Sequence, residues 1–138
     1  MEQKYIIGDV VMYDNKIMVI KEPRDGSQFD LSCHKEGLVY CLVDIDEIKP
    51  ARLTPDILEK NGWNKEGKDG SDFSLSEVFM GGDEDDEDNF TCFQLYYQNK
   101  KDGWVIDMRG EPLKFKIQYI HELQHLFFGL GINHEMEV

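Results

Sequence analysis

One short stretch near the C-terminus carries residues whose types and spacing could do hydrolytic chemistry. His121, Glu122 and His125 lie in YIHELQHL, residues 119–126, and spell the H-E-x-x-H pattern of zinc peptidases. On a helix, histidines four residues apart can offer ring nitrogens to one Zn²⁺, and the Glu between them can polarise a metal-bound water. One interpretation of the chain is therefore a zinc metallopeptidase, with His121 and His125 as ligands and Glu122 as base.

The pattern lacks the third protein ligand that a catalytic zinc needs. The metzincin extension would require glycine at 128 and histidine at 131, where this chain has Phe128 and Gly131. Too little chain follows His125 for a second helix, so the substitutes are His134, Glu135, Glu137 and the upstream Cys33 and His34. Chance alone produces such a five-letter match about once in a hundred chains of this composition. We therefore expect no catalytic residue, no metal and no cofactor, and interpret the chain as not an enzyme.

A predicted helix over residues 118–130 positions these groups. Its apolar residues recur at steps of three and four, which makes a stripe expected to pack on a sheet: Ile120, Leu123, Phe127 and Leu130. The alternative to zinc chemistry is that both histidines flank this stripe, with ring nitrogens bonded to backbone or water and Glu122 solvated. The candidate residues for binding a ligand or partner are then Tyr119, His121, Gln124 and His125.

Runs of β-branched and apolar residues predict the rest of the fold. Residues 10–13 and 17–20, separated by Asp14-Asn15-Lys16, indicate a hairpin, and residues 38–43 form another strand after a polar loop, 23–37. Four later strands form an antiparallel meander, at 73–80, 90–98, 104–108 and 113–117. We expect an α+β fold, with a small N-terminal SH3-like sheet or barrel and a C-terminal antiparallel meander packed by one helix.

The division of the chain is predicted from its polar connections. Thr54 and Pro55 begin a short helix over 54–61, and the polar, glycine-rich segment 64–70 follows it. This predicts an N-terminal half, 1–63, and a C-terminal half, 71–138. Because 138 residues are few for two independent domains, we expect one cooperative unit.

Charge excludes one class of partner. Twenty-eight Asp and Glu against fifteen Lys and Arg give a formal charge of −13, so direct binding to nucleic acid is not expected. Part of the excess is one run, expected as a solvated, mobile loop: Asp83, Glu84, Asp85, Asp86, Glu87 and Asp88. An alternative is that the run mimics nucleic-acid phosphate and occupies a basic groove of a host protein.

Compartment and association follow from absent signals. No apolar run reaches the roughly 18 residues of a membrane span, and the N-terminus lacks a secretion signal, so we expect a cytosolic protein with no membrane partner. Cys33, Cys41 and Cys92 are expected as reduced, mostly buried packing residues. Edge strands of the meander leave a homodimer open. The aromatic residues expected to pack in the core, although they could line a pocket, are Trp63, Phe93, Tyr96, Tyr97 and Trp104.

Three segments together resemble a known family. They are IIGDVV at 6–11, IKPARLTPDILEKNGW at 48–63 and IQYIHELQHL at 117–126. In order and across nearly the whole chain, they are similar to a family of small proteins from phages, prophages and mobile elements of gut anaerobes. The last helix of that family typically reads Y-V-H-Q-L-Q-N-L-Y, so Glu122 and His125 depart from its pattern. The resemblance therefore implies that zinc hydrolysis is not its function.

A binding function is the interpretation that these features of the sequence favour. The resemblance and the lack of a complete nucleophile, phosphate-loop or metal pattern favour a non-enzymatic accessory protein of a phage or mobile element. It would act in the host cytosol by binding a host macromolecule or a small ligand. An anti-defence role is included, either as an inhibitor of an immune protein or as a protein that sequesters its nucleotide signal.

Overall fold

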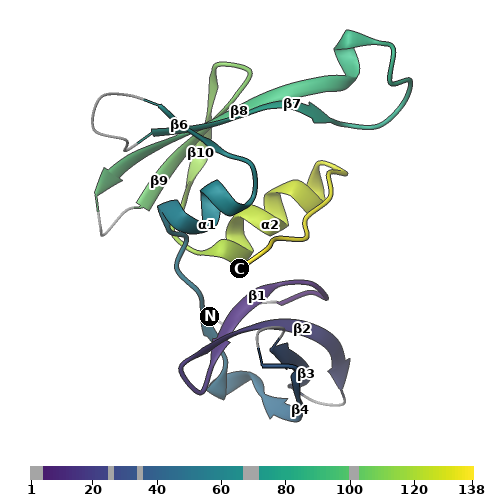
Figure 1. Cartoon of the computed structure of the whole chain (residues 1–138), viewed down its shortest axis with the longest axis vertical. Helices are drawn as coiled ribbons and strands as arrows, with labels where there is room; N and C mark the ends of the chain where they lie inside the picture. Colours follow the sequence, from purple (N-terminus) through teal and green to yellow (C-terminus); the bar gives the residue numbers. More distant parts are fainter. Residues whose placement is uncertain (1–4, 25–26, 34–35, 67–71, 100–102) are drawn as a thin grey trace.

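The computed structural model describes residues 5–24, 27–33, 36–66, 72–99 and 103–138. Within them the chain forms two five-stranded antiparallel sheets, stacked along the long axis of the molecule with two α-helices beside the upper one (Figure 1). We call residues 5–50 the N-terminal lobe and residues 51–138 the C-terminal lobe. The expected α+β class is confirmed.

The N-terminal lobe is a strand meander closed by a short fifth strand. Its elements are β1 (Val10–Tyr13), β2 (Lys16–Arg24), β3 (Gln28–Cys33), β4 (Leu38–Asp44), the 3-10 turn η1 (Ile45–Glu47) and β5 (Lys49–Pro50). The sheet order is β4-β3-β2-β1-β5, in which the fifth strand returns to the first, as in an SH3-like barrel. The predicted hairpin turn has positive φ at Asp14 (52°) and Asn15 (59°), which suits a two-residue turn between twisted strands.

Strand β3 corrects the prediction of a polar loop at 23–37. The hydrophobic pattern of the sequence does not indicate this strand, because Asp30 and Ser32 are polar. Both residues are nevertheless buried, at 5% and 7% exposed. Leu31 and Cys33 are buried beside them. A strand whose polar residues also face inward shows no alternation of apolar and polar positions, so its periodicity does not reveal it.

The C-terminal lobe contains the predicted meander and one further strand. Its strands are β6 (Asn64–Glu66), β7 (Asp72–Phe79), β8 (Phe90–Asn99), β9 (Gly103–Met108) and β10 (Glu111–Ile117), in the order β10-β9-β8-β7-β6. Helix α2 (Ile120–Gly129) packs its apolar stripe against this sheet, because Leu123 and Phe127 share a buried cluster with Phe73 and Phe93. No helix of the described residues is long and apolar enough to cross a bilayer.

The packing boundary differs from the one predicted at 64–70. Helix α1 (Pro55–Lys60) begins as expected, with Thr54 Oγ1 accepting a hydrogen bond from Ile57 N at 3.3 Å. However, Ile57 and Leu58 are buried with Trp63 in the core of the C-terminal lobe. Residues 64–66 already pair with β7 as strand β6, and 67–70 lie outside the described residues. By packing, the chain changes lobe near Ala51.

The β1–β2 hairpin is apolar on both faces. Val11, Met18 and Ile20 face the inner core of the N-terminal lobe. Val10 is buried in the core cluster of the C-terminal lobe, and Met12, Ile17 and Val19 pack against the same cluster. Successive side chains of a strand point to opposite faces, so one continuous apolar run serves both lobes. The hairpin is therefore the apolar part of the junction between them.

The three cysteines are free, but their burial differs from the prediction. Cys33 is buried, whereas Cys41 and Cys92 are exposed. Cys92 lies between the buried Thr91 and Phe93 on β8, so the alternation of the strand turns its side chain outward. Only Cys33 is a packing residue.

Candidate functional site

Glu122, which would be the base only in the alternative zinc interpretation, is a helix cap. Its Oε1 accepts hydrogen bonds from Gln118 N at 3.0 Å and Tyr119 N at 2.9 Å, just before the start of α2. An acidic residue at the third helical position satisfies backbone donors that the helix leaves unpaired. Glu122 is half-buried and bonded, not solvated as expected. Its carboxylate is thus engaged in holding the helix start.

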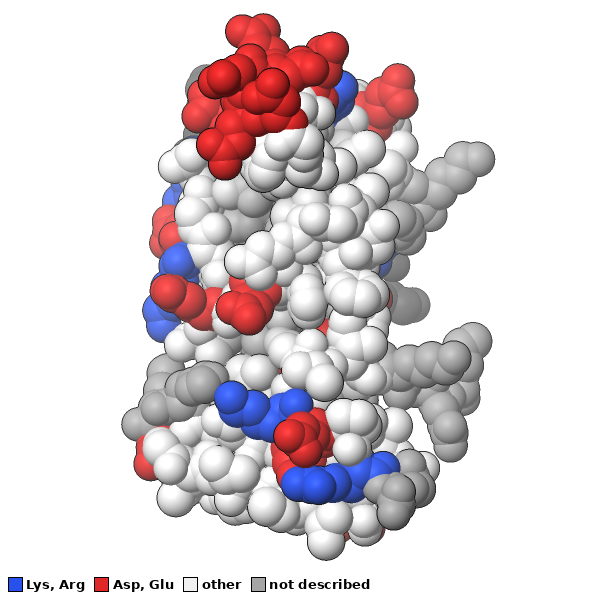
Figure 2. Space-filling view, turned by 90° about the vertical axis from the view of Figure 1, so that its right-hand side faces the viewer, with Lys and Arg blue, Asp and Glu red and all other residues white. Residues whose placement is uncertain are grey.

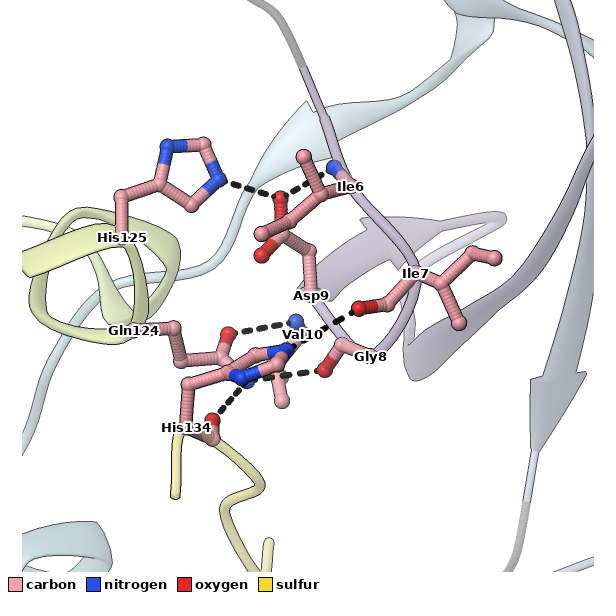
Figure 3. Close-up of polar contacts among 8 residues, drawn as sticks. All are labelled: Ile6, Ile7, Gly8, Asp9, Val10, Gln124, His125 and His134. Carbon is pink, nitrogen blue, oxygen red and sulfur yellow. Dashed lines mark hydrogen bonds and ion pairs between the residues drawn. The ribbon is translucent and has the colours of Figure 1, made fainter. Parts of the chain in front are cut away.

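Gln124 joins three segments that are distant in sequence (Figure 3). Its Oε1 accepts a hydrogen bond from Val10 N at 2.8 Å, and its Nε2 donates to Gly8 O at 2.8 Å and to His134 O at 2.9 Å. The side chain is fully buried. Since buried backbone groups are costly when unpaired, this amide replaces the hydrogen bonds that the start of β1 and the C-terminal tail would otherwise lack.

His125 makes an ion-pair-distance contact at this junction. Its Nε2 lies 2.7 Å from Asp9 Oδ2, which also accepts a hydrogen bond from Ile6 N at 2.8 Å (Figure 3). Asp9 is fully buried, while the His125 side chain is 34% exposed. The expected partner was backbone or water, so the carboxylate is a correction that no local pattern indicates. Asp9 Oδ1 is buried and has no hydrogen-bond partner within the described part of the chain.

His121 is a packed ring beside this pair. It is 6% exposed, with ring centroids 5.3 Å from Tyr5, 6.1 Å from Tyr119 and 5.4 Å from His125. Its buried Nδ1 has no hydrogen-bond partner among the described residues. Burial lowers the pKa of His121, against smaller opposing effects of Asp9 and Glu122. The ring is thereby favoured in its neutral form.

The described residues offer no ligand set for the zinc of the alternative interpretation. Among the described residues, no group of three or more His, Cys, Asp and Glu side chains is arranged to hold a metal ion. The substitute ligand His134 instead places Nε2 3.2 Å from Ile7 O. His34 lies outside the described residues. The H-E-x-x-H residues are brought together by α2, but each contacts a different group.

Tyr119 belongs to the same junction from its other side. Its ring lies under the Arg52 guanidinium, 6.0 Å from centroid to Cζ, and the backbones of the two residues form an isolated bridge. Leu53 N donates to Gln118 O at 3.0 Å, and Ile120 N to Ala51 O at 2.8 Å. The three segments on which the family resemblance rests therefore meet around α2. Residues 51–53 bond to 118–120 within the C-terminal lobe, whereas residues 8–10 bond to Gln124 and His125 across the junction between the lobes.

The acidic run Asp83 to Asp88 lies at the far end of the C-terminal lobe, in the loop between β7 and β8 (Figure 1). All six residues are exposed, as expected. Their side chains also shape the loop, since Asp85 N donates to Asp83 Oδ1 at 2.9 Å and Asp88 N to Asp86 Oδ1 at 3.0 Å. Figure 2 shows acidic side chains gathered over this end of the molecule. The run and the α2 residues form two separate regions.

A third region, absent from the predicted site residues, lies on β4. Leu42 has φ of 56°, a conformation that costs energy for a leucine. Its N donates to Asp30 Oδ1 at 3.1 Å, and Arg24 Nε donates to Asp30 Oδ2 at 2.7 Å. These hydrogen bonds, with that of Arg24 first, hold the pKa of Asp30 below its usual value. The Arg24–Asp30 pair thus keeps the Leu42 side chain facing solvent, where it is 58% exposed.

Comparison with known proteins adds no name to these three regions. No protein-family model matches the chain. No curated protein and no solved structure matches it either.

Proposed function

We propose that the chain is a non-enzymatic binding protein of a phage or mobile element, which docks an extended segment of a host protein along strand β4. The observation that carries this proposal is the apolar outer edge of the N-terminal sheet. β4 is the last strand in the order β4-β3-β2-β1-β5. Its side chains of Leu38, Val39 and Leu42 are 42%, 62% and 58% exposed.

This edge lacks the usual protection against pairing. Edge strands in natural proteins carry charged residues, proline or a covering segment, because their unpaired backbone groups accept another strand. Residues 38–43 contain neither a charge nor proline. The bulge opposite Phe29 and Leu31 is a protective device, and Leu42 lies within it. Such an edge suits strand addition, in which main-chain bonds supply affinity and apolar side chains supply specificity.

The charges at the two ends of β4 favour one kind of incoming strand over another. Asp44, Asp46 and Glu47 are exposed where the strand ends, whereas Glu36, before its start, is paired with Lys16 at 2.9 Å. An incoming antiparallel strand places its N-terminal end beside the acidic end of β4. A segment preceded by Lys or Arg is therefore favoured. A second copy of the chain brings a net charge of −13 and the same acidic end, which argues against the homodimer.

The contacts of the H-E-x-x-H residues support a non-enzymatic function. Glu122 caps α2, and His125 lies against Asp9. The groups that a zinc peptidase would use for water activation and metal binding thus hold the start of α2 and the junction of the lobes, respectively. Blocking a host immune protein in the cytosol through the β4 edge is the anti-defence form of this proposal.

Synthetic strands test the proposal directly. Two fluorescent peptides share one alternating Val-Thr strand, and two lysines precede the strand in one and follow it in the other. We expect both peptides to bind saturably, as measured by fluorescence anisotropy. The peptide in which the lysines come first should bind several-fold more tightly. Val39→Lys should abolish binding, while Phe128→Lys, which places the same charge on an equally exposed site of α2, should leave it unchanged. Absence of binding, or equal loss in both variants, contradicts the proposal.

The acidic loop carries a second candidate function, as a mimic of nucleic-acid phosphate. The observation that favours it is the ordered display of six exposed acidic residues at one end of the molecule (Figure 2). The side chains of Asp83 and Asp86 shape the loop by accepting hydrogen bonds from its backbone. The other four acidic side chains of the run, those of Glu84, Asp85, Glu87 and Asp88, do not accept these bonds. Those carboxylates are free to face a basic groove.

Neutralising the outer carboxylates tests this candidate without reshaping the loop. The variant Glu84→Gln, Asp85→Asn, Glu87→Gln, Asp88→Asn keeps Asp83 and Asp86 as turn-forming acceptors. If the loop mimics phosphate, the native chain displaces duplex DNA from a host DNA-binding protein and the variant does not. The Val39→Lys variant should compete as the native chain does. Equal competition by the native and neutralised chains contradicts mimicry.

A further inference from the structure

A pocket of about 370 Å³ lies between the start of α1, the end of β8 and the start of β9. Arg52 and Thr54 line it from the segment that links the lobes, Tyr97 and Trp104 from the meander, and Gln118 from the residues before α2. Its volume is within the range of small-molecule sites. It is separate from the β4 edge and from the acidic loop, so neither proposed function uses it.

One wall of the pocket is aromatic. The rings of Tyr97 and Trp104 lie 5.0 Å apart at 64°, edge to face. Trp104 is 4% exposed and supports Tyr97, which is 39% exposed. A supported aromatic ring that remains open to solvent offers a flat, rigid surface for another ring. This wall therefore suits a planar ligand.

The pocket also has a positively charged residue in its lining. Arg52 is the only charged residue that lines the pocket within the described chain, although the whole chain carries 28 acidic residues. Its guanidinium is placed over the Tyr119 ring at 6.0 Å. Arginine presents a planar fork of donors that matches carboxylate and phosphate oxygens. Arg52 thus brings a positively charged side chain to this pocket.

Two further groups around the pocket are polar and uncharged. Thr54 Oγ1 accepts a hydrogen bond from Ile57 N at 3.3 Å, and a hydroxyl that accepts one bond still has its proton to donate. The Gln118 side chain supplies an amide at the pocket lining. An apolar, aromatic wall with a few polar groups and one cation is the usual composition of a site for small organic anions.

We propose that this pocket binds a small planar aromatic anion, with its ring on Tyr97 and its carboxylate or phosphate on Arg52. The ligand class covers nucleoside phosphates and aromatic carboxylates, which share both recognition elements. Binding here does not depend on a protein partner at β4. The pocket adds a small-molecule site to the proposed docking protein.

Equilibrium dialysis with matched probe pairs tests the site. The probes are adenosine 5′-monophosphate against adenosine, and nicotinate against nicotinamide. At least one anion should bind saturably and at least tenfold more tightly than its neutral counterpart, and added salt should weaken it. Tighter binding of the nucleotide identifies phosphate as the preferred group, and tighter binding of nicotinate identifies carboxylate. No saturable binding of either anion, or no preference over the neutral probe, overturns the proposal.

Variants and spectroscopy locate the binding. Arg52→Gln should weaken the affinity for the anion by roughly tenfold to a hundredfold, as expected for loss of a charged hydrogen-bond partner. Lys60→Gln, the same change of charge on α1 outside this pocket, should have no effect. In the native chain, the indole N–H resonance of Trp104 should shift on titration while that of the core residue Trp63 stays in place. Equal losses in both charge variants, or a shift of Trp63 alone, contradict this location.

Discussion

The two lobes reach stability with different amounts of apolar material. The C-terminal lobe buries large aromatic rings, among them Phe73, Phe93 and Trp104, in one cluster with α1 and α2. The inner core of the N-terminal lobe has eight buried residues among those described, of which Tyr5 alone is aromatic, and Tyr13, Phe29 and Tyr40 are only partly buried against it. Because a small core supplies little free energy, the N-terminal lobe depends on its contacts with α2. β4 is the last strand of its sheet, and it is there that we propose a partner strand docks.

Core truncations should show this dependence with the largest effect. Phe93→Ala should lower the free energy of unfolding by about 3–5 kcal/mol, measured by urea denaturation. Hydrogen exchange in this variant should accelerate in both lobes, because the N-terminal lobe loses its support. Leu31→Ala, a matched truncation in the smaller core, should accelerate exchange in the N-terminal lobe alone. If N-terminal amides keep their protection in Phe93→Ala, the dependence of one lobe on the other is wrong.

Loss of the polar contacts at the junction should give the next largest decrease in the free energy of unfolding. Gln124→Leu keeps a similar volume but leaves the partners of Gln124, Val10 N and the carbonyls of Gly8 and His134, without it. We expect a loss of about 2–4 kcal/mol in the free energy of unfolding, since each buried unpaired group costs about 1–3 kcal/mol. Gln94→Leu, on a half-buried residue of β8 away from the junction, should cost less than about 1 kcal/mol. Similar losses in both variants would show that the junction amide has no special role.

A glycine pair sharpens the comparison within the C-terminal lobe. Gly103 has φ of 77°, and an added Cβ would lie 2.4 Å from Ile117 O, whereas Gly110 has φ of 82° with nothing within 4 Å. Gly110→Ala should cost about 1 kcal/mol, for the backbone conformation alone. Gly103→Ala should cost more, about 2–3 kcal/mol, because β9 must also move away from Ile117. Thermal denaturation of both variants checks the difference, and equal costs would contradict the close approach.

The smallest expected effect is a pH dependence from the junction. Burial lowers the pKa of His121 from 6.5, Asp9 and Glu122 oppose this shift, and His125 adds to it. The unfolded chain therefore binds the proton at a higher pH than the folded chain. The contribution of His121 to the free energy of unfolding falls as pH drops below about 7, and levels off below the folded-state pKa. Urea midpoints between pH 8 and 5 should fall less in His121→Leu than in the native chain; an equal fall assigns the dependence to other groups.

The elements with regular periodicity were predictable. The apolar stripe of α2 packs on the meander as expected, because residues three and four apart share one helix face. The four predicted meander strands are present within a few residues of their predicted bounds. Strand β3 was missed because the buried Asp30 interrupts its pattern, and its partner Arg24 is read as part of a loop. The unbroken apolar character of 17–20 was a usable signal of two-sided burial.

The candidate site was predictable only in part. His121, Gln124 and His125 do share one face of α2, as their spacing implies. Their partners could not be predicted, because Asp9 and Val10 lie more than a hundred residues away along the chain. The β4 edge was predicted as a strand, but its position at the end of the sheet is a property of strand order. The pocket at Arg52 and Tyr97 likewise joins residues that no local pattern connects.

The sequence by itself determined the charge, the fold class, the long strands and the amphipathic last helix, since each depends on composition or on a local period. The tertiary structure alone decided what the H-E-x-x-H residues do. Glu122 caps the helix, His125 meets Asp9, and His121 is buried against aromatic rings. A motif specifies which side chains share a helix face, but the chemistry of a histidine or carboxylate is set by the groups and the burial that surround it. Those surroundings come from segments at the other end of the chain.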